Sequence, residues 1–272
     1  MTKDFIELKG KQAGPTSVIL VGVHGDEKCG LLAIKKILPR LKIEEGLVLI
    51  GVGNPLAAQR NKRYIQADLN RMFKPAKSIL ASDKKSYEYK RAQVLKRYLK
   101  QADFLLDLHS SASRKSKPFI ICQANARKII QYLPVGLVVS GFDQKEPGGT
   151  DYYMNKIGKV GICVECGYTK DKKSTLLAEK SILNFLKAAG NIENNLTAGN
   201  KKIYFKIFQL YRNKTDNFVL KKQFADFEKI NAGQIIGVDG SRQIKAKKSG
   251  LILFAHNRSQ AGREAFLLLE QK

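Results

Sequence analysis

The fold is decided by the stretch Val18-Ile19-Leu20-Val21-Gly22-Val23-His24-Gly25-Asp26-Glu27. Its apolar run predicts a buried strand, and the two glycines that bracket His24 predict a turn directly after that strand. In open α/β sheets, ligands bind beyond the carboxyl ends of the strands. His24 and Glu27 are therefore expected where such a fold carries out its chemistry. An imidazole nitrogen and a carboxylate oxygen are both suitable zinc ligands.

A second apolar run, residues 104–108, ends at His109. The chain has three histidines, so two of the three close a predicted buried strand. A single histidine in such a place is more often structural. His24, Glu27 and His109 together, with water in the fourth position, form a hydrolytic zinc arrangement. We therefore predict one zinc ion per chain, and we interpret His256 as structural or substrate-facing.

Composition limits the class of protein. The chain has 272 residues, 43% of them hydrophobic, which suits one large domain or a main domain with a small one. The formal charge of +25 attracts anions, such as acidic substrates, nucleic acid or anionic membranes, although a solvated basic surface explains it equally well. There is no Trp and no run of aromatics interleaved with Arg, so nucleic acid is not expected as a partner.

The compartment follows from what the chain lacks. No stretch has the length of a signal-peptide core or of a membrane span. We therefore expect a cytoplasmic protein without membrane contact, with its four cysteines as thiols. Cys163 and Cys166 have the spacing of a metal-binding pair. On a strand, however, residues three apart point to opposite faces, so this pair is not interpreted as a zinc site.

Periodicity predicts an α/β fold. Strands are expected at residues 16–23, 47–52, 104–108, 119–122, 135–139 and 160–164, with helices at 28–38, 82–98 and 174–189. The order strand, helix, strand at the start predicts a parallel pair. A long segment without clear periodicity, residues 54–82, is expected to be functional or mobile. After residue 190, short alternating runs predict a small all-β domain, so we divide the chain into 1–190 and 191–272.

A hydrolytic site also needs a base and a group that stabilises an oxyanion. Glu165 follows an apolar strand, where burial raises the pKa of a carboxylate and suits it to proton transfer. The alternative is a structural Glu paired with Arg or Lys. The long segment offers Arg63 and Arg71 as cations, and Arg71 lies beside Asn70. A planar guanidinium next to an amide suits a carboxylate.

The motifs as a set resemble the succinylglutamate desuccinylase/aspartoacylase family, a branch of the zinc carboxypeptidase-like fold. The matching pieces span residues 16–167 and occur in the family's order. They are Gly22-Val23-His24-Gly25-Asp26-Glu27, Asn54-Pro55, Arg63, Asp68-Leu69-Asn70-Arg71-Met72-Phe73, Asp107-Leu108-His109 and Val164-Glu165-Cys166-Gly167. The resemblance implies a mixed, mainly parallel sheet flanked by helices, with a small C-terminal β domain.

The resemblance also implies roles for the site residues. The zinc ligands would be His24, Glu27 and His109. The metal-activated water would be deprotonated by Glu165 as general base, which would then protonate the leaving amine. Arg63 would polarise the scissile carbonyl. A substrate carboxylate would bind Asn70 and Arg71. The family hydrolyses the amide of a small N-acyl amino acid, so a small anionic substrate of this kind is the expected partner.

The chain departs from aspartoacylase-like members in two places. Those members carry a further substrate-binding Arg shortly before the catalytic Glu. Here no Arg lies between Arg127 and Arg212, and the nearby candidates are Asn155, Lys156 and Lys159. Those members also carry a Tyr before the Glu-Ala-Phe segment, and here residues 258–263 contain none. Both departures concern substrate identity rather than the metal chemistry.

Three functions remain open at this stage. The first is a zinc-dependent amide hydrolase acting on an N-acyl amino acid. The second is a zinc carboxypeptidase, because the same residues can cleave a C-terminal peptide bond. The third is a basic protein without enzymatic activity that binds polyanions in a salt-dependent way, although it gives the strand-end residues no role. The sequence is compatible with a homo-oligomer and does not define the oligomeric state.

Overall fold

The structure is a computed structural model that describes residues 5–197, 199 and 201–272. Its helices are α1 (Cys29–Ile37), α2 (Pro55–Gln59), α3 (Tyr87–Leu99), α4 (Arg127–Ile130), α5 (Phe142–Lys145), α6 (Thr150–Lys156) and α7 (Lys172–Ala189). The strands are β1 (Phe5–Lys9), β2 (Gln12–Val21), β3 (Glu45–Val52), β4 (Phe104–Ser111), β5 (Phe119–Cys122), β6 (Leu137–Ser140), β7 (Val160–Tyr168), β8 (Ile203–Arg212), β9 (Phe218–Leu220), β10 (Glu228–Ile230), β11 (Ile235–Asp239), β12 (Arg242–Lys245), β13 (Gly250–Leu253) and β14 (Glu264–Gln271).

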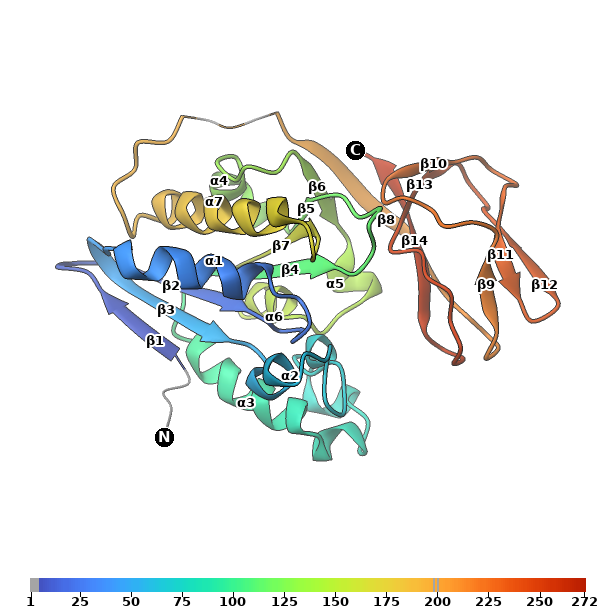
Figure 1. The fold of residues 1–272 in the computed structure, drawn as a ribbon, viewed down its shortest axis with the longest axis horizontal. Helices are drawn as coiled ribbons and strands as arrows, with labels where there is room; N and C mark the ends of the chain where they lie inside the picture. The colour runs from blue at the N-terminus through green and yellow to red at the C-terminus, as the bar shows by residue number, and fades with distance from the viewer. Residues whose placement is uncertain (1–4, 198, 200) are drawn as a thin grey trace.

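A mixed sheet crosses the molecule (Figure 1). Its strand order is β1-β3-β2-β4-β7-β5-β6-β8-β14-β13-β10. β2 pairs in parallel with both β3 and β4, and β4 pairs in parallel with β7. The predicted α/β class and the parallel pair at the start of the chain are therefore confirmed. The three parallel strands β2, β4 and β7 end at the same edge of the sheet, as ligand sites in α/β folds require.

Apolar side chains cover both faces of the central strands. Alternate residues of β2 point to opposite faces: Ile19 packs with α1 and α7, whereas Leu20 packs with α3. Figure 1 shows α1 and α7 side by side on one face of the sheet and α3 on the other. The expected helix at 82–98 begins only at Tyr87, because the hydroxyl of Ser86 accepts the N–H of Tyr89 and caps the helix there.

The C-terminal region, residues 201–272, continues the same sheet. β8 pairs in parallel with β6, and β14, β13 and β10 follow it in antiparallel order. A second sheet, β12-β11-β9, lies at the end of the molecule farthest from β1 (Figure 1). The C-terminal region is thus all-β, as predicted, but hydrogen bonds join its first strand to the central sheet. None of the helices in the described part of the chain is long and apolar enough to cross a membrane.

The long segment after β3 is held by one buried carboxylate. Glu88, on α3, is fully buried and accepts the side-chain amide of Asn54 at 3.1 Å. It also accepts three backbone N–H groups, at 2.7, 3.2 and 3.2 Å, from residues 65, 66 and 67. Asn54 in turn caps α2 by accepting the N–H of Ala57. The segment that carries Arg63 and Arg71 is therefore fixed although it contains little regular structure.

Candidate active site

The turn after β2 brings His24 and Glu27 to the end of the sheet. Gly22 has a φ of 62°, a left-handed conformation that favours glycine. At Gly25 an added Cβ would lie 2.1 Å from the backbone of Ala57, so only glycine fits this close approach. The N–H of Gly25 donates to the carbonyl of Arg63 at 3.1 Å. The two glycines of the motif thus place the turn against the segment that carries Arg63.

Strand register brings the other residues to the same place. Val21 of β2 lies opposite Leu108 of β4, and His109 lies opposite Glu165 of β7. On β4, Asp107 and His109 point to the same face, because residues two apart on a strand share a face. The histidine and the glutamate that the sequence places at two separate strand ends are therefore direct neighbours in the sheet.

His24, Glu27 and His109 form a buried cluster. One ligand atom of each lies within 4.8 Å of the others. The carboxylate of Glu27 contacts Nδ1 of His24 at 2.8 Å and Nδ1 of His109 at 2.9 Å. The two Nδ1 atoms are 3.2 Å apart, and all three residues are at most 6% exposed. Two imidazole nitrogens that converge on one carboxylate are a donor set that fits zinc.

The outer nitrogen of each histidine also faces a carboxylate. Nε2 of His24 lies 3.2 Å from Asp68, and Nε2 of His109 lies 3.2 Å from Asp107. The hydroxyl of Thr150 donates to Asp107 at 2.5 Å. A carboxylate behind a histidine fixes the ring tautomer and orientation, an arrangement typical of metal-binding histidines. Asp68 and Asp107 therefore aim both Nδ1 atoms at the centre of the cluster.

The charges of the cluster favour a cation. Burial alone would raise the pKa of Glu27, but His24 and His109 hold that pKa well below its usual value. Burial alone would lower the pKa of His109, but Asp107 and Glu27 raise it well above its usual range. The carboxylates around the cluster thus favour a positive charge at this buried site. A divalent cation bound there would supply that charge without a proton on either imidazole.

Glu165 lies beside the cluster and lines the cavity described below. It is 9% exposed, and burial is the main reason that its pKa is raised to about 7. The charge of Glu27 acts in the same direction, whereas His109 opposes it. A carboxylate with a pKa near neutrality can both accept and return a proton at physiological pH.

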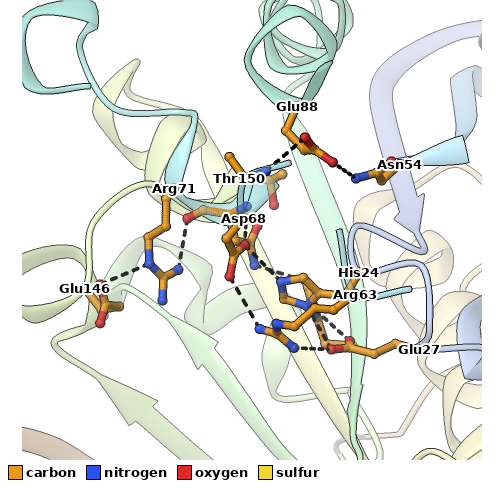
Figure 2. A network of polar contacts seen from close by, with 12 residues as sticks. His24, Glu27, Asn54, Arg63, Asp68, Arg71, Glu88, Glu146 and Thr150 are labelled. Atoms are coloured by element: carbon orange, nitrogen blue, oxygen red, sulfur yellow. Dashed lines mark hydrogen bonds and ion pairs between the residues drawn. The ribbon is translucent and has the colours of Figure 1, made fainter. Parts of the chain in front are cut away.

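Arg63 and Asn70 extend toward the cluster from the segment after β3. Arg63 lies between two carboxylates, with Nη1 at 3.1 Å from Glu27 and Nη2 at 3.7 Å from Asp68 (Figure 2). The side-chain nitrogen of Asn70 is 3.5 Å from Nε2 of His109. The sequence-predicted residues from four separate segments are thus brought within reach of one another.

Arg71 has a different environment. Its Nε contacts Glu146 at 3.1 Å and its Nη2 contacts Glu264 at 2.8 Å. Arg212 contacts the same two glutamates, at 2.8 and 3.0 Å. We call Arg71, Glu146, Arg212 and Glu264 the four-charge cluster. It joins the segment after β3 to the C-terminal region, because Arg212 and Glu264 are paired residues of β8 and β14.

A cavity of about 600 Å³ opens over these residues, a volume typical of small-molecule sites. Its lining includes Glu165 and Arg63 from the N-terminal part of the chain and His256 and Arg258 from the C-terminal region. The residues of the segment before Glu165 that line the cavity are Phe142, Asp143, Glu146, Gly149, Asp151, Tyr152 and Cys163. The candidates for the missing Arg do not line it: Asn155 donates to Asp143 and Lys159 binds Asp103, and Lys156 lies against the ring of Tyr152.

Three site residues carry no role in the sequence argument. Asp68 orients His24, and its position within the Asp-Leu-Asn-Arg motif is the one signal that pointed to it. Glu146 and Asp151 lie in a segment without clear periodicity, where the structure has the short helices α5 and α6. The ion-pair partners of Glu146, Arg71 and Arg212, lie far away in the sequence, and the place of Asp151 in the cavity depends on tertiary packing, so no local pattern could identify either residue.

Comparison with known proteins gives the family. The sequence profile of the succinylglutamate desuccinylase/aspartoacylase catalytic domain matches residues 13–194. An N-acyl-aromatic-L-amino acid amidohydrolase (carboxylate-forming) from Xenopus tropicalis is 30% identical over 173 residues, covering 57% of this chain and 56% of the relative. A probable aspartoacylase from Acaryochloris marina is 35% identical over 117 residues, covering 38% of this chain and 37% of the relative. The chain spans about half the length of the curated relatives it matches.

Solved structures agree in fold. Succinylglutamate desuccinylase from Vibrio cholerae has a TM-score of 0.82 and 20% identity, covering 99% of this chain and 86% of that one. A succinylglutamate desuccinylase/aspartoacylase from Rhodobacter sphaeroides has a TM-score of 0.72 and 20% identity, covering 99% and 94%. At these identities the likeness establishes the fold alone. Because the profile covers well over half of the sequence, the chain belongs to the succinylglutamate desuccinylase/aspartoacylase family, a family of amidohydrolases and deacylases.

Proposed function

We propose that the protein is a zinc-dependent amide hydrolase that removes the acyl group from a small N-acyl amino acid. The observation that carries this proposal is the convergence of His24, Glu27 and His109 within 4.8 Å, directly beside Glu165. The proposed zinc ligands are Nδ1 of each histidine and the carboxylate of Glu27. When bound, zinc polarises a carbonyl oxygen and lowers the pKa of water to near neutrality.

We assign proton transfer to Glu165. As a carboxylate it accepts a proton from the attacking water, and as a carboxylic acid it returns that proton to the leaving amine. The raised pKa of Glu165, about 7 because of burial, suits both halves of this exchange. The products are a carboxylic acid and a free amino acid.

The cations of the segment after β3 hold the substrate in this proposal. Arg63 donates to the scissile carbonyl oxygen and stabilises the negative charge that develops there. Asn70 and Arg71 bind the substrate carboxylate. Arg71 already binds Glu146 and Glu264, but an Arg has five N–H donors and these contacts and its bond to Asn70 use only part of them. The names of the relatives, which include an amidohydrolase of N-acyl amino acids, support this substrate class.

We further propose that residues 1–190 are the catalytic domain and that residues 191–272 form a β domain that closes the cavity. Support comes from the cavity lining, because Arg258 and His256 of the C-terminal region face the same space as Glu165. The four-charge cluster would then fix the β domain over the catalytic domain.

The first experiment is metal analysis of purified wild type, His109→Ala and His256→Ala, followed by a panel of N-acyl amino acids. We expect about one zinc per chain in wild type and His256→Ala and none in His109→Ala, with hydrolysis only where zinc is retained. His256 is the matched control, because it is the remaining histidine of the chain. Stoichiometric zinc without hydrolysis of any panel member would contradict the proposal. Peptides with free and amidated C-termini in the same panel separate a deacylase from a carboxypeptidase.

A further inference from the structure

The segment just before β7 places a carboxylate in the active-site cavity. Asp151, in the first turn of α6, is 9% exposed and lines the cavity. The donor that reaches its side chain is the backbone N–H of its neighbour Tyr152. Among the described residues no cation forms an ion pair with it. A buried carboxylate without a cationic partner is unfavourable for the folded protein, which suggests that a ligand supplies the missing charge.

An acceptor without a hydrogen bond lies next to Asp151. The side-chain oxygen of Asn70 is buried and receives no hydrogen bond from the described part of the chain. A Cβ added to Gly149 would lie 2.5 Å from Oδ1 of Asp151 and 3.8 Å from Oδ1 of Asn70. Both oxygens therefore flank the same glycine, and that of Asn70 lacks the donor that a buried acceptor normally has.

The same wall of the cavity carries a further carboxylate. Asp143 lines the cavity, and Asn155 donates to it at 3.1 Å. Burial, and then the charge of Asp143, raise the pKa of Asp151 to about 7. Within the described residues, neither aspartate belongs to a cluster with the geometry of a metal site. An ammonium group fits this wall, because it carries one positive charge and three N–H donors.

The lining of the cavity also contains cations. Three of its arginines are Arg63, Arg258 and Arg263, and the Nε of Arg258 donates to the carbonyl of Glu264 at 2.5 Å. Burial, and then the neighbouring cations Arg258 and Arg63, lower the pKa of His256 to about 4, so His256 is neutral at pH 7. The cavity lining thus contains arginines that suit a carboxylate and aspartates that suit a cation.

We propose that Asp151 and the amide oxygen of Asn70 bind a positively charged amine on the substrate, so that the enzyme prefers N-acyl diamino acids over N-acyl amino acids with neutral or acidic side chains. This inference rests on the proposed amide hydrolase function. It assigns Asp151 as a specificity residue in the segment where aspartoacylase-like members carry a substrate-binding Arg. An Arg in this segment suits a substrate with an acidic side chain, whereas Asp151 suits a substrate with a cationic side chain.

The test compares two substrates of the same shape, Nα-acetyl-L-ornithine and N-acetyl-L-norleucine, which differ by an ammonium in place of a methyl group. A charge-assisted contact contributes about 1.5–3 kcal/mol, so wild type should show a kcat/KM at least about 10-fold higher for the ornithine substrate. In Asp151→Asn this preference should disappear, while kcat/KM for the norleucine substrate changes less than about 3-fold. Equal kcat/KM for both substrates in wild type, or an unchanged preference in Asp151→Asn, would overturn the inference.

A stability measurement separates this role from a structural one. Asp151→Asn removes a buried charge that has no cationic partner, so its unfolding midpoint should equal or exceed that of wild type. A structural Asp151 would instead give a lower midpoint. Gly149→Ala is the second variant. Its Cβ would meet Oδ1 of Asp151, so it should lower the same substrate preference.

Calorimetry with free L-ornithine and free L-norleucine distinguishes the two proposals. If no amide is hydrolysed but wild type binds ornithine at least about 10-fold more tightly than norleucine, and Asp151→Asn does not, the hydrolase proposal fails and the amine site stands. If amides are hydrolysed without any preference for the amine, the hydrolase proposal stands and the amine site is overturned.

Discussion

The cluster of His24, Glu27 and His109 and the four-charge cluster both contribute residues to the cavity lining, yet they differ in their balance of charge. Three carboxylates, those of Glu27, Asp68 and Asp107, contact the two histidines, and within the described residues Arg63 is the one guanidinium that forms ion pairs with any of the three. In the four-charge cluster, Arg71 and Arg212 face Glu146 and Glu264 in equal number. From this difference we infer that an excess of charge, rather than the presence of charge, distinguishes a ligand site from a structural ion-pair cluster. A cluster with equal numbers of cations and anions stabilises the structure by itself, whereas a buried excess of carboxylates favours the binding of a cation.

Burial strengthens the contrast. The side chains of His24, Glu27 and His109 are 2–8% exposed, whereas Arg212 is 40% exposed and Glu264 33%. Water screens the pair of Arg212 and Glu264, so this pair contributes little to stability, whereas the side chain of Glu146 is 9% exposed and its pairs are less screened.

Removal of a metal ligand should have the largest effect. His109→Ala takes one imidazole from the cluster, so we expect zinc to be lost and kcat/KM to fall by more than about 10³-fold. Zinc content and hydrolysis of an N-acyl amino acid are the measurements, with His256→Ala as control. Full activity in zinc-free His109→Ala would show that the charge excess has another purpose.

Glu165→Gln should separate chemistry from metal binding. The amide cannot accept a proton, so kcat should fall by about 10²–10⁴-fold. Zinc content should remain near that of wild type, because Glu165 is not among the three proposed ligands. Loss of zinc in this variant would instead make Glu165 a ligand.

Asp68→Asn should weaken the cluster from its outer side. The amide keeps the shape of the carboxylate but not its charge, so His24 is less firmly oriented. We expect zinc affinity to fall by about 10–100-fold, measured by competition with a chelator. Asp83→Asn is the control, since Asp83 lies in the short turn before α3, outside the site. Equal affinity in wild type and Asp68→Asn would show that Asp68 has no role in orienting His24.

Asp239 is a case in which we expect a buried carboxylate without an ion pair to have a structural role rather than a ligand-binding one. Asp239 is buried and forms no ion pair within the described residues, but it accepts hydrogen bonds from Tyr211, Lys214 and Thr215. Burial alone would raise its pKa, but these hydrogen bonds bring it down to about 2. A depressed pKa stabilises the fold above the usual pKa of Asp and ceases to do so as pH falls toward 2. We expect Asp239→Asn to lower the free energy of unfolding at pH 7 by about 1–2 kcal/mol, and by less near pH 2. A difference that is independent of pH would contradict this.

Arg212→Ala should have the smallest effect. It breaks the balance of the four-charge cluster, but the partly exposed pairs limit the loss of unfolding free energy to about 1 kcal/mol. Arg242→Ala, an exposed arginine on β12, is the control. A loss of several kcal/mol would mean that the four-charge cluster is effectively buried.

The sequence predicted the elements whose signals are local. His24 and His109 follow apolar strands, and parallel strands end at one edge, so their meeting followed from the pattern. The partners of Arg71 could not be predicted in this way, because Glu264 lies 193 residues away. Nor could Asp151, since α6 has seven residues and its place against the cavity depends on how α6 packs on β7. Likewise, nothing in the alternating pattern of β8 indicated that it would pair with β6.

The way that Glu88 holds its segment bears on how this active site can be altered. Three of its four contacts reach backbone N–H groups, and a backbone N–H is present whatever the side chain, except at proline. Ile65 and Gln66 can therefore be exchanged for many other types while Arg63 and Asp68 on either side keep their places, whereas Ala67 is buried in the core and must stay small. Two adjacent positions between Arg63 and Asp68 are thus open to substitution, although one carboxylate on a neighbouring helix holds the segment.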